Sequence, residues 1–268
     1  MTPKAATTPA TARRGIQSIE VGGCLLKALV ASEQAMGLKD LANAAGMPSA
    51  KAHAYLVSLG KLGLVTQEPD SGRYALGAFA LQMGLSALHQ LDPIKLAIPA
   101  AAELADRLRV NIAIAVWGNM GPTVVHIEEY SSQIHVNMRP GTVMTPLLLT
   151  ATGQCFAAFL PERITQQWLL GEIGKASQGT QGTLHVTRKQ AKHVLEEVRT
   201  QGLSRAMGHP IPGIHALSAP VFQHNGHIAL ALTAMGPATD FDAQWDGPTA
   251  DHLRQCAAQL SASLGYNG

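Results

Sequence analysis

The chain has 268 residues, of which 46% are hydrophobic and 14% are charged, and its formal net charge is +2. This composition is typical of a folded globular protein and excludes a chain that is disordered throughout. No apolar run reaches the roughly 18 residues that cross a bilayer, so we predict no membrane-spanning segment. The cysteines Cys24, Cys155 and Cys256 are odd in number and far apart, which favours a cytoplasmic protein without disulfides.

The first residues of the chain differ in composition from the rest. Residues 1–15 read MTPKAATTPATARRG and lack an apolar core, so we predict a disordered tail rather than a signal peptide. Residues 1–80 carry a net charge of +3 and the remainder carries −1. A mildly basic N-terminal part is compatible with nucleic-acid binding but does not establish it.

Three helices are predicted after the tail from the spacing of apolar residues. They cover residues 19–31, residues 38–46 and a segment that starts after Pro48. Gly46 is a typical helix stop, and Ser49 is the expected N-cap of the third helix. The buried stripe of that helix should consist of Ala52, Leu56, Leu59 and Leu62, which leaves Lys51, Tyr55 and Ser58 off the stripe and His53 near its edge.

A β-hairpin is predicted directly after these helices. Residues 63–77 read GLVTQEPDSGRYALG, with apolar and polar residues alternating around Pro-Asp-Ser-Gly. Three helices followed by a hairpin form a winged helix-turn-helix, here residues 16–78. Its third helix would lie in the major groove, and Arg73 at the hairpin tip would meet the DNA backbone or the minor groove.

The next segment is predicted to contain two apolar helices. Residues 78–108 have helical spacing throughout except at Leu91-Asp92-Pro93, where the chain should break. We expect residues 79–92 to form a linker helix. Its apolar face is a natural surface for a dimer or for a strut between domains.

Residues 93–268 are predicted to form an α+β domain on an antiparallel sheet. Strands and helices are mixed here without a regular βαβ alternation. Thr150, Thr152 and Gly153 are the expected start of a helix. The predicted strands cover residues 111–118, 122–130, 133–139, 213–222 and 226–236, and further helices cover residues 164–173, 187–202 and 248–264.

Several segments together resemble one known family. LKDLANAAGMPSAKAHAYLVSLGKLGLV with SGRYALG, AAELADRLRVNIAIAVW, TPLLLTATGQCFAAFLP, GIHALSAPVF and ALALTAMGP occur in the family's order. The chain therefore resembles the IclR family of bacterial transcription regulators over nearly its whole length. This resemblance implies a winged helix, a linker helix and a GAF/profilin-like effector-binding domain. It also implies dimers or tetramers on palindromic operators in double-stranded DNA.

The DNA-reading helix departs from the family pattern. Where relatives usually have Ser-Thr-Val-His-Arg, this chain has Ala-Lys-Ala-His-Ala at residues 50–54, and Val21 and Cys24 replace family arginines. Lost phosphate contacts weaken binding and lower its salt dependence. The alternative for this helix is an ordinary solvated face. The predicted DNA contacts are Ser49, Ala50, Lys51, His53, Tyr55 and Arg73, with Lys61, Arg13 and Arg14 as further candidates.

The effector site departs from the family as well. Relatives often have an acidic run where this chain has GLSRAMGHPIPG, so Arg205 and His209 should favour an anion. Free N–H groups at Thr152 and Gly153 would hold a carboxylate at the helix start. We therefore predict a small organic acid, with room for an aromatic body beside Met138, Met144 and Leu147. The resemblance places Thr150, Ala151, Thr152, Gly153, Ala206, Ala216, Thr233 and Met235 near this pocket.

Other chemistry has weaker support. His209, His215, His224 and His227 are spaced more widely than zinc ligands usually are, so we predict no metal and no cofactor. For Cys155, the role of a small buried apolar side chain is favoured over that of a redox sensor. The chain lacks hydrolase, metalloprotease and Rossmann motifs, so we predict a regulator and not an enzyme. The alternatives are a small-molecule sensor whose winged helix only dimerises, and a metal-dependent C-terminal enzyme.

Overall fold

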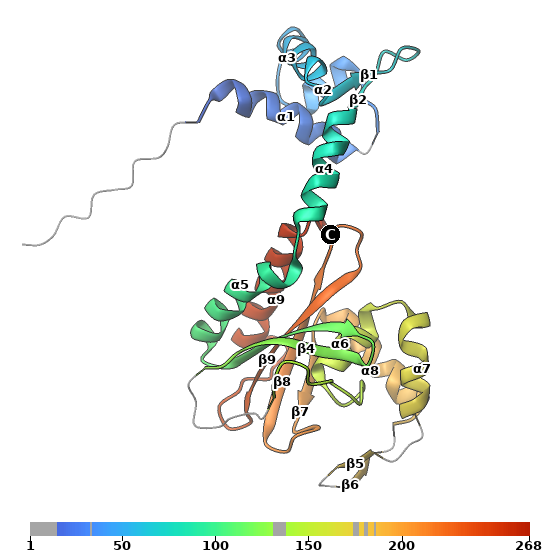
Figure 1. The fold of residues 1–268 in the computed structure, drawn as a ribbon, viewed down its shortest axis with the longest axis vertical. Helices are drawn as coiled ribbons and strands as arrows, with labels where there is room; N and C mark the ends of the chain where they lie inside the picture. Colours follow the sequence, from blue (N-terminus) through green and yellow to red (C-terminus); the bar gives the residue numbers. More distant parts are fainter. Residues whose placement is uncertain (1–14, 33, 131–137, 174–176, 180–181, 185) are drawn as a thin grey trace, which may run out of the picture. The chain divides into compact units, whose positions relative to one another are not determined.

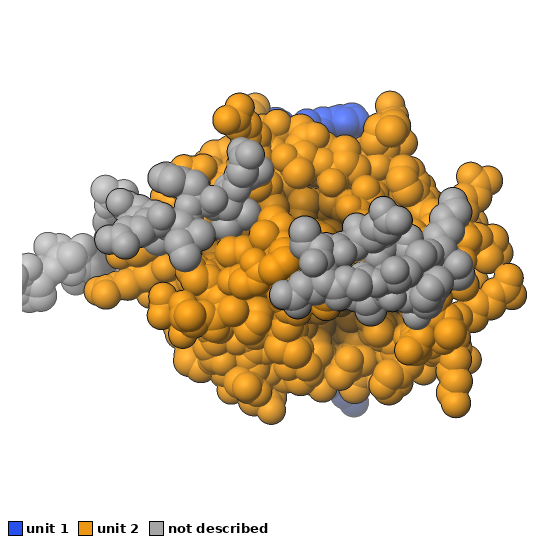
Figure 2. All heavy atoms as spheres, turned by 90° about the horizontal axis from the view of Figure 1, so that it is seen from below, with its two compact units in different colours: residues 1–91 blue, residues 92–268 orange. Residues whose placement is uncertain are grey.

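The structure is a computed structural model that describes residues 15–32, 34–130, 138–173, 177–179, 182–184 and 186–268. It consists of two compact units, residues 1–91 and residues 92–268. Figure 1 shows the elements of both units, and Figure 2 draws their atoms in two colours, with the face of the second unit hollowed near its middle. The predicted tail, apart from Gly15, and most of the strand expected at residues 133–139 lie outside the described residues; Met138 and Arg139 are not in a strand.

The first unit is a helix-turn-helix followed by a short hairpin. Its helices pack around a core that includes Leu25, Leu41 and Leu56, all almost inaccessible to solvent. Met36 pairs with Tyr74 and adds a third chain segment beside the hairpin. The elements are α1 (Gln17–Ser32), α2 (Leu38–Ala44), α3 (Ser49–Lys61), β1 (Val65–Gln67), β2 (Tyr74–Leu76) and α4 (Ala78–Gln90).

The turn between α2 and α3 is built by backbone hydrogen bonds around a glycine. Gly46 has a φ of +66°, which a side chain would disfavour. The N–H of Met47 donates to the carbonyl oxygen of Ala42 at 3.0 Å, and the N–H of Gly46 donates to that of Asn43 at 3.0 Å. These hydrogen bonds close the turn at the end of α2, and α3 follows this turn.

Two local predictions for α3 are wrong. Pro48 is the N-cap, and Ser49 is the first helical residue, without a capping hydrogen bond from its side chain. Leu62 follows the last helical residue and is 62% exposed, so it is not part of the buried stripe. The helix ends at Lys61, and Leu62 is its C-cap, with near-helical backbone angles and a solvent-facing side chain.

The hairpin and the helix that follows it are held together at a glycine. Gly77 precedes α4, and a Cβ there would collide with the backbone oxygen of Gly63. The N–H of Gly77 donates to the carbonyl oxygen of Leu64 at 2.9 Å. No residue of α4 itself is buried in the described chain.

The second unit is a five-stranded antiparallel sheet with helices on both faces. The strand order is β4-β3-β9-β8-β7. Figure 1 shows α5 and α9 side by side on one face, while α6 covers the other face and α8 packs on α6. The helices are α5 (Pro93–Leu108), α6 (Ala151–Phe159), α7 (Glu162–Glu172), α8 (Arg188–Gln201) and α9 (Pro248–Ser263). The sheet consists of β3 (Asn111–Gly118), β4 (Gly121–Glu128), β7 (Ser204–Met207), β8 (Ile214–Phe222) and β9 (Ile228–Pro237).

The predicted fold class is confirmed: a helix-turn-helix precedes an α+β domain with an antiparallel sheet. Three strands were not predicted from the sequence: β7 and the small pair β5 (Ser177–Gly179) and β6 (Gly182–Leu184). These strands are too short for an alternating pattern to stand out. Among the described helices, none has both the length and the apolar character that crossing a bilayer requires.

Candidate DNA-binding helix and effector cavity

The solvent-facing side of α3 carries the predicted DNA contacts. Ser49, Ala50, Lys51 and His53 are all exposed, and the first turn of α3 contains no acidic residue. A helix N-terminus with a basic side chain and no carboxylate is electrostatically suited to phosphate. Ala50 is small, so the backbone at this end of the helix can approach a groove closely.

Tyr55 differs from its predicted neighbours because it is half-buried. Its ring packs beside α1, where a Cβ on Gly22 would lie 3.2 Å from Tyr55 Cδ1. Tyr55 also contacts the core cluster of the first unit. Gly22, which lowers the helix propensity of α1, therefore leaves room for this ring. Tyr55 packs α3 against α1.

Arg73 is exposed at the hairpin, close to acidic neighbours in the sequence. Its N–H donates to Ser71 Oγ at 3.1 Å, and Ser71 Oγ donates to Glu68 Oε2 at 2.6 Å. These bonds order the turn, and Gly72 completes it with a φ of +65°. The turn thus presents the Arg73 side chain to solvent.

A small cavity in the second unit lies where α6 begins beside β8 and β9. Its volume is about 40 Å³, and most of its wall is apolar. It is formed by seven of the nine predicted effector residues: Thr150, Ala151, Thr152, His209, Ala216, Thr233 and Met235. The wall also includes the expected neighbours Met138, Met144 and Ala206, together with Pro210, Ile211 and Ile214.

The start of α6 is held by Thr150 and Gly153. Thr150 Oγ1 accepts from the N–H of Gly153 at 2.9 Å and donates to the carbonyl oxygen of Met144 at 3.1 Å. The expectation of a free N–H at Gly153 is therefore wrong, because the N-cap side chain already uses it. The N–H groups of Ala151 and Thr152 lie in the first turn of α6, ahead of the helical hydrogen-bond pattern.

Buried hydroxyl groups connect this helix to the sheet behind the cavity. Thr152 Oγ1 and Thr233 Oγ1 are 2.8 Å apart, and Thr233 Oγ1 donates to Ser218 Oγ at 2.9 Å. Ser204 Oγ donates to the carbonyl oxygen of Ala151 at 2.6 Å. Ser204 and Ser218 are not among the predicted site residues, although Ser218 stands as a small polar residue inside the apolar run GIHALSAPVF.

Arg205 is not among the residues that form the cavity. Its guanidinium carbon lies 4.3 Å from the centre of the Trp245 ring, and its Nη1 donates to the carbonyl oxygen of Ala243 at 3.3 Å. Neighbouring residues of a strand point to opposite faces, so Ala206 faces the cavity and Arg205 does not. Leu147 is likewise outside the wall, fully buried in the core beside α8.

Glu172 is a further residue that supports the cavity and was not predicted from the sequence. Its carboxylate accepts from the N–H groups of Leu147 at 2.6 Å and Leu148 at 3.1 Å. Burial raises the pKa of this carboxyl, and the two N–H bonds act in the opposite direction. The bonds position the segment between Met144 and Thr150, which both form part of the cavity wall. A single acid at a helix end gives no local signal of this role.

The cysteine and histidine candidates show no reactive arrangement. Cys155 is fully buried, and burial raises the pKa of its thiol to about 12, so the thiol stays protonated at neutral pH. Within the described part of the chain, no group of three or more His, Cys, Asp or Glu side chains is placed to hold a metal ion.

Comparison with known proteins identifies both units. Residues 18–69 match the IclR helix-turn-helix domain, and residues 85–262 match the C-terminal domain of the bacterial transcriptional regulator IclR. The chain is 31% identical over 257 residues to the glycerol operon regulatory protein of Streptomyces griseus, covering 94% of this chain and 98% of that one.

Solved structures agree with the sequence relatives. Pseudomonas aeruginosa HmgR is 38% identical, with a TM-score of 0.84 over 94% of this chain and 100% of that one. An IclR homolog from Microbacterium hydrocarbonoxydans, solved in complex with 4-hydroxybenzoate, has the same fold at 19% identity and a TM-score of 0.54, over 92% of this chain and 98% of that one. The relatives are transcription regulators and not enzymes. The chain belongs to the IclR family of bacterial transcriptional regulators, with an N-terminal helix-turn-helix DNA-binding domain and a C-terminal effector domain.

Proposed function

We propose that this regulator binds a specific palindromic operator and that a small organic acid modulates its affinity for that operator. The observation that carries the proposal is the acid-free, exposed first turn of α3, with Lys51 and His53 on its solvent side. Arg73 in the hairpin adds a second basic contact. Because the partner is DNA, we place the protein in the cytoplasm.

The chemistry of the cavity supports an acid with an apolar or aromatic body. Met138, Met144 and Met235 surround it, and methionine side chains rearrange readily to admit a ring. His209 and the first N–H groups of α6 are the groups that would meet a carboxylate. The homolog solved with 4-hydroxybenzoate supports the same chemical class.

The effector would act by binding two arrangements of the DNA-binding units with different affinity. Half-sites of a palindrome are read together only when two recognition helices have the spacing of successive major grooves. A ligand that favours one arrangement shifts this equilibrium. A coupling of about 1–3 kcal/mol is sufficient for regulation.

The experiment that tests this function is DNA binding across a salt series. We expect tight, salt-dependent binding to the DNA immediately upstream of the protein's own gene, and release by a candidate aromatic acid at millimolar concentration. Lys51→Ala should weaken binding about tenfold and lower the salt slope by about one, because one phosphate contact is lost. Fluorescence anisotropy measures both quantities.

The control for this experiment is Lys189→Ala, which removes the same charge from an exposed position on α8. It should bind DNA like the unchanged protein. Equal binding of the unchanged protein to upstream and random DNA, at every salt concentration, would favour the alternative of a small-molecule sensor whose winged helix only dimerises. Failure of every acid to alter DNA binding would remove the effector part of the proposal.

We further propose that α4 pairs with α4 of a second copy. Leu81, Leu85 and Leu88 follow one helical stripe and are 65%, 49% and 38% exposed. An unpaired apolar stripe of this kind is costly in water. Pairing would also bring two DNA-binding units together, as a palindromic operator requires.

Replacing Leu85 with glutamate should disrupt this pairing. A charge in the middle of an apolar interface should cost about 2 kcal/mol, or roughly thirtyfold in the dissociation constant of the dimer. Sedimentation velocity measures the change, with Gln82→Glu as a control because Gln82 is an exposed polar residue of the same helix. If Leu85→Glu and Gln82→Glu associate as strongly as the unchanged chain, α4 is not the contact surface.

A further inference from the structure

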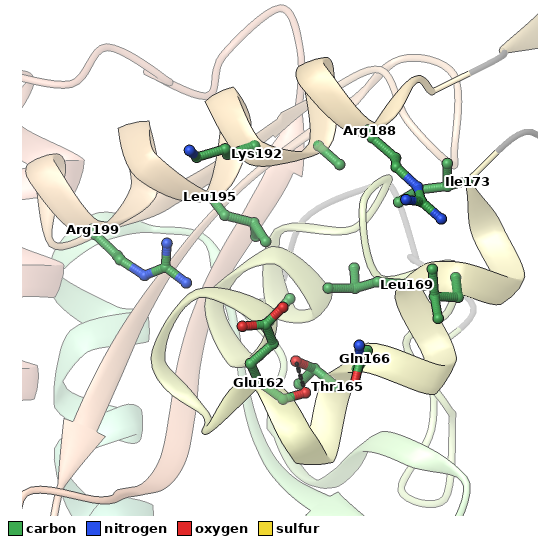
Figure 3. Close-up of a pocket in the computed structure, with 12 residues that line it drawn as sticks. Glu162, Thr165, Gln166, Leu169, Ile173, Arg188, Lys192, Leu195 and Arg199 are labelled. Carbon is green, nitrogen blue, oxygen red and sulfur yellow. Dashed lines mark hydrogen bonds between the residues drawn. The ribbon is translucent and has the colours of Figure 1, made fainter.

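A second cavity lies between α7 and α8, separate from the effector cavity. Its volume is about 390 Å³, and its wall comes from α6, α7 and α8. This volume falls within the roughly 300–1,000 Å³ that is usual for small-molecule sites. Figure 3 shows side chains of both helices pointing into the space between them.

The floor of this cavity is aliphatic. It consists of Ala157 of α6, Leu169 of α7, Ile173 directly after α7, and Ala191 and Leu195 of α8. All five of these side chains belong to or pack on one core cluster, so the floor is the outer surface of a folded core. Such a floor suits a flexible hydrocarbon chain and offers no aromatic face for stacking.

The edge of the cavity carries an excess of positive charge. Arg188, Lys192 and Arg199 lie along α8, and Glu162 is the one acidic residue in the wall among the described residues. Arg188 and Arg199 are three helical turns apart, about 16 Å along the axis, and on the same side of α8. Arg188 and Arg199 therefore mark opposite ends of the cavity wall, as Figure 3 shows.

The three cations are not equivalent. Arg199 Nε donates to the carbonyl oxygen of Ala158 at 2.7 Å, and Lys192 Nζ lies 3.7 Å from Glu196 Oε1. Arg188 forms no ion pair with any residue that the structure describes. Figure 3 shows its guanidinium directed into the cavity near Ile173, away from Glu162. Among the described residues of the wall, this end offers a carboxylate a cation and no acidic side chain.

We propose that the cavity between α7 and α8 binds a medium-chain alkyl carboxylate. The carboxylate contacts Arg188, and the alkyl chain lies along Leu169 and Leu195 toward Arg199. The ligand is extended because Leu169 and Leu195, which contact its alkyl chain, lie on the cavity floor away from Arg188. This site is distinct from the effector cavity and does not depend on the identity of the effector.

Isothermal titration calorimetry with decanoate tests the proposal on the full chain. Decanoate should bind, octanoate should bind about tenfold more weakly because two methylene groups are lost, and decyltrimethylammonium should bind far more weakly than decanoate. Arg188→Gln should weaken decanoate binding about tenfold, since one charge-assisted contact is lost. Lys189→Gln, the same charge change one residue along α8, should leave it unchanged.

Methyl NMR spectra locate the bound acid. Decanoate should shift the methyl signals of Leu169 and Leu195 and leave those of Met138, Met144 and Met235 in place. Shifts confined to the three methionines would put decanoate in the effector cavity and overturn the proposal. Equal affinity of the Arg188→Gln and Lys189→Gln variants would also overturn it. An absence of decanoate binding would overturn it as well, and weaker self-association of Arg188→Gln in that case would indicate that the cavity contacts a second copy.

Discussion

Replacing Gly153 with alanine should destabilise the effector domain by about 3 kcal/mol, because the added methyl group meets fixed backbone. A Cβ at this position would lie 2.5 Å from the carbonyl oxygen of Leu147 and 2.5 Å from Thr150 Oγ1. To make room, the chain must move the start of α6 or break the bond between Gly153 and Thr150. Either movement also alters the effector cavity.

Urea denaturation followed by circular dichroism measures this loss. The matched control is Gly171→Ala, also within a helix, where an added Cβ would meet no atom within 4 Å. That change should stabilise the protein by up to about 1 kcal/mol, because alanine is the better helix former. If the two variants are equally stable, the close approach at Gly153 does not constrain the fold.

Replacing Thr233 with valine should cost about 2–3 kcal/mol of stability and weaken effector binding. Valine has nearly the same shape, so the change removes only the hydroxyl group. That hydroxyl lies 2.8 Å from Thr152 Oγ1 and 2.9 Å from Ser218 Oγ, and all three residues are buried. A buried polar group without a partner costs about 1–3 kcal/mol, and two such groups would remain.

The control for this change is Thr165→Val. Thr165 is also buried, but its hydroxyl makes one long bond of 3.5 Å to the carbonyl oxygen of Glu162. Its loss should cost less than about 1 kcal/mol. Chemical denaturation compares the variants, and titration with the acid that releases DNA compares their affinity. Equal losses in the two valine variants would mean that the hydroxyl chain behind the cavity contributes little.

Local sequence signals predicted the elements of this protein well. Gly46 ends a helix, Pro-Asp-Ser-Gly forms a hairpin, Asp92-Pro93 starts a new helix and Thr150 caps another. Each of these features depends on backbone preferences within a few residues, so it can be inferred without knowing what surrounds it. The IclR family itself was recognised from five such segments in order.

The sequence alone determined the fold class, the helix-turn-helix and the segments that form the candidate effector cavity. Only the tertiary structure decided which side chains face which space. Arg205 faces Trp245 because its strand has one register in the sheet, and Tyr55 is held by a glycine 33 positions earlier in the chain. Glu172 and the cavity beside Arg188 depend on how α6, α7 and α8 pack. These contacts join residues distant in sequence, and local patterns carry no information about such packing.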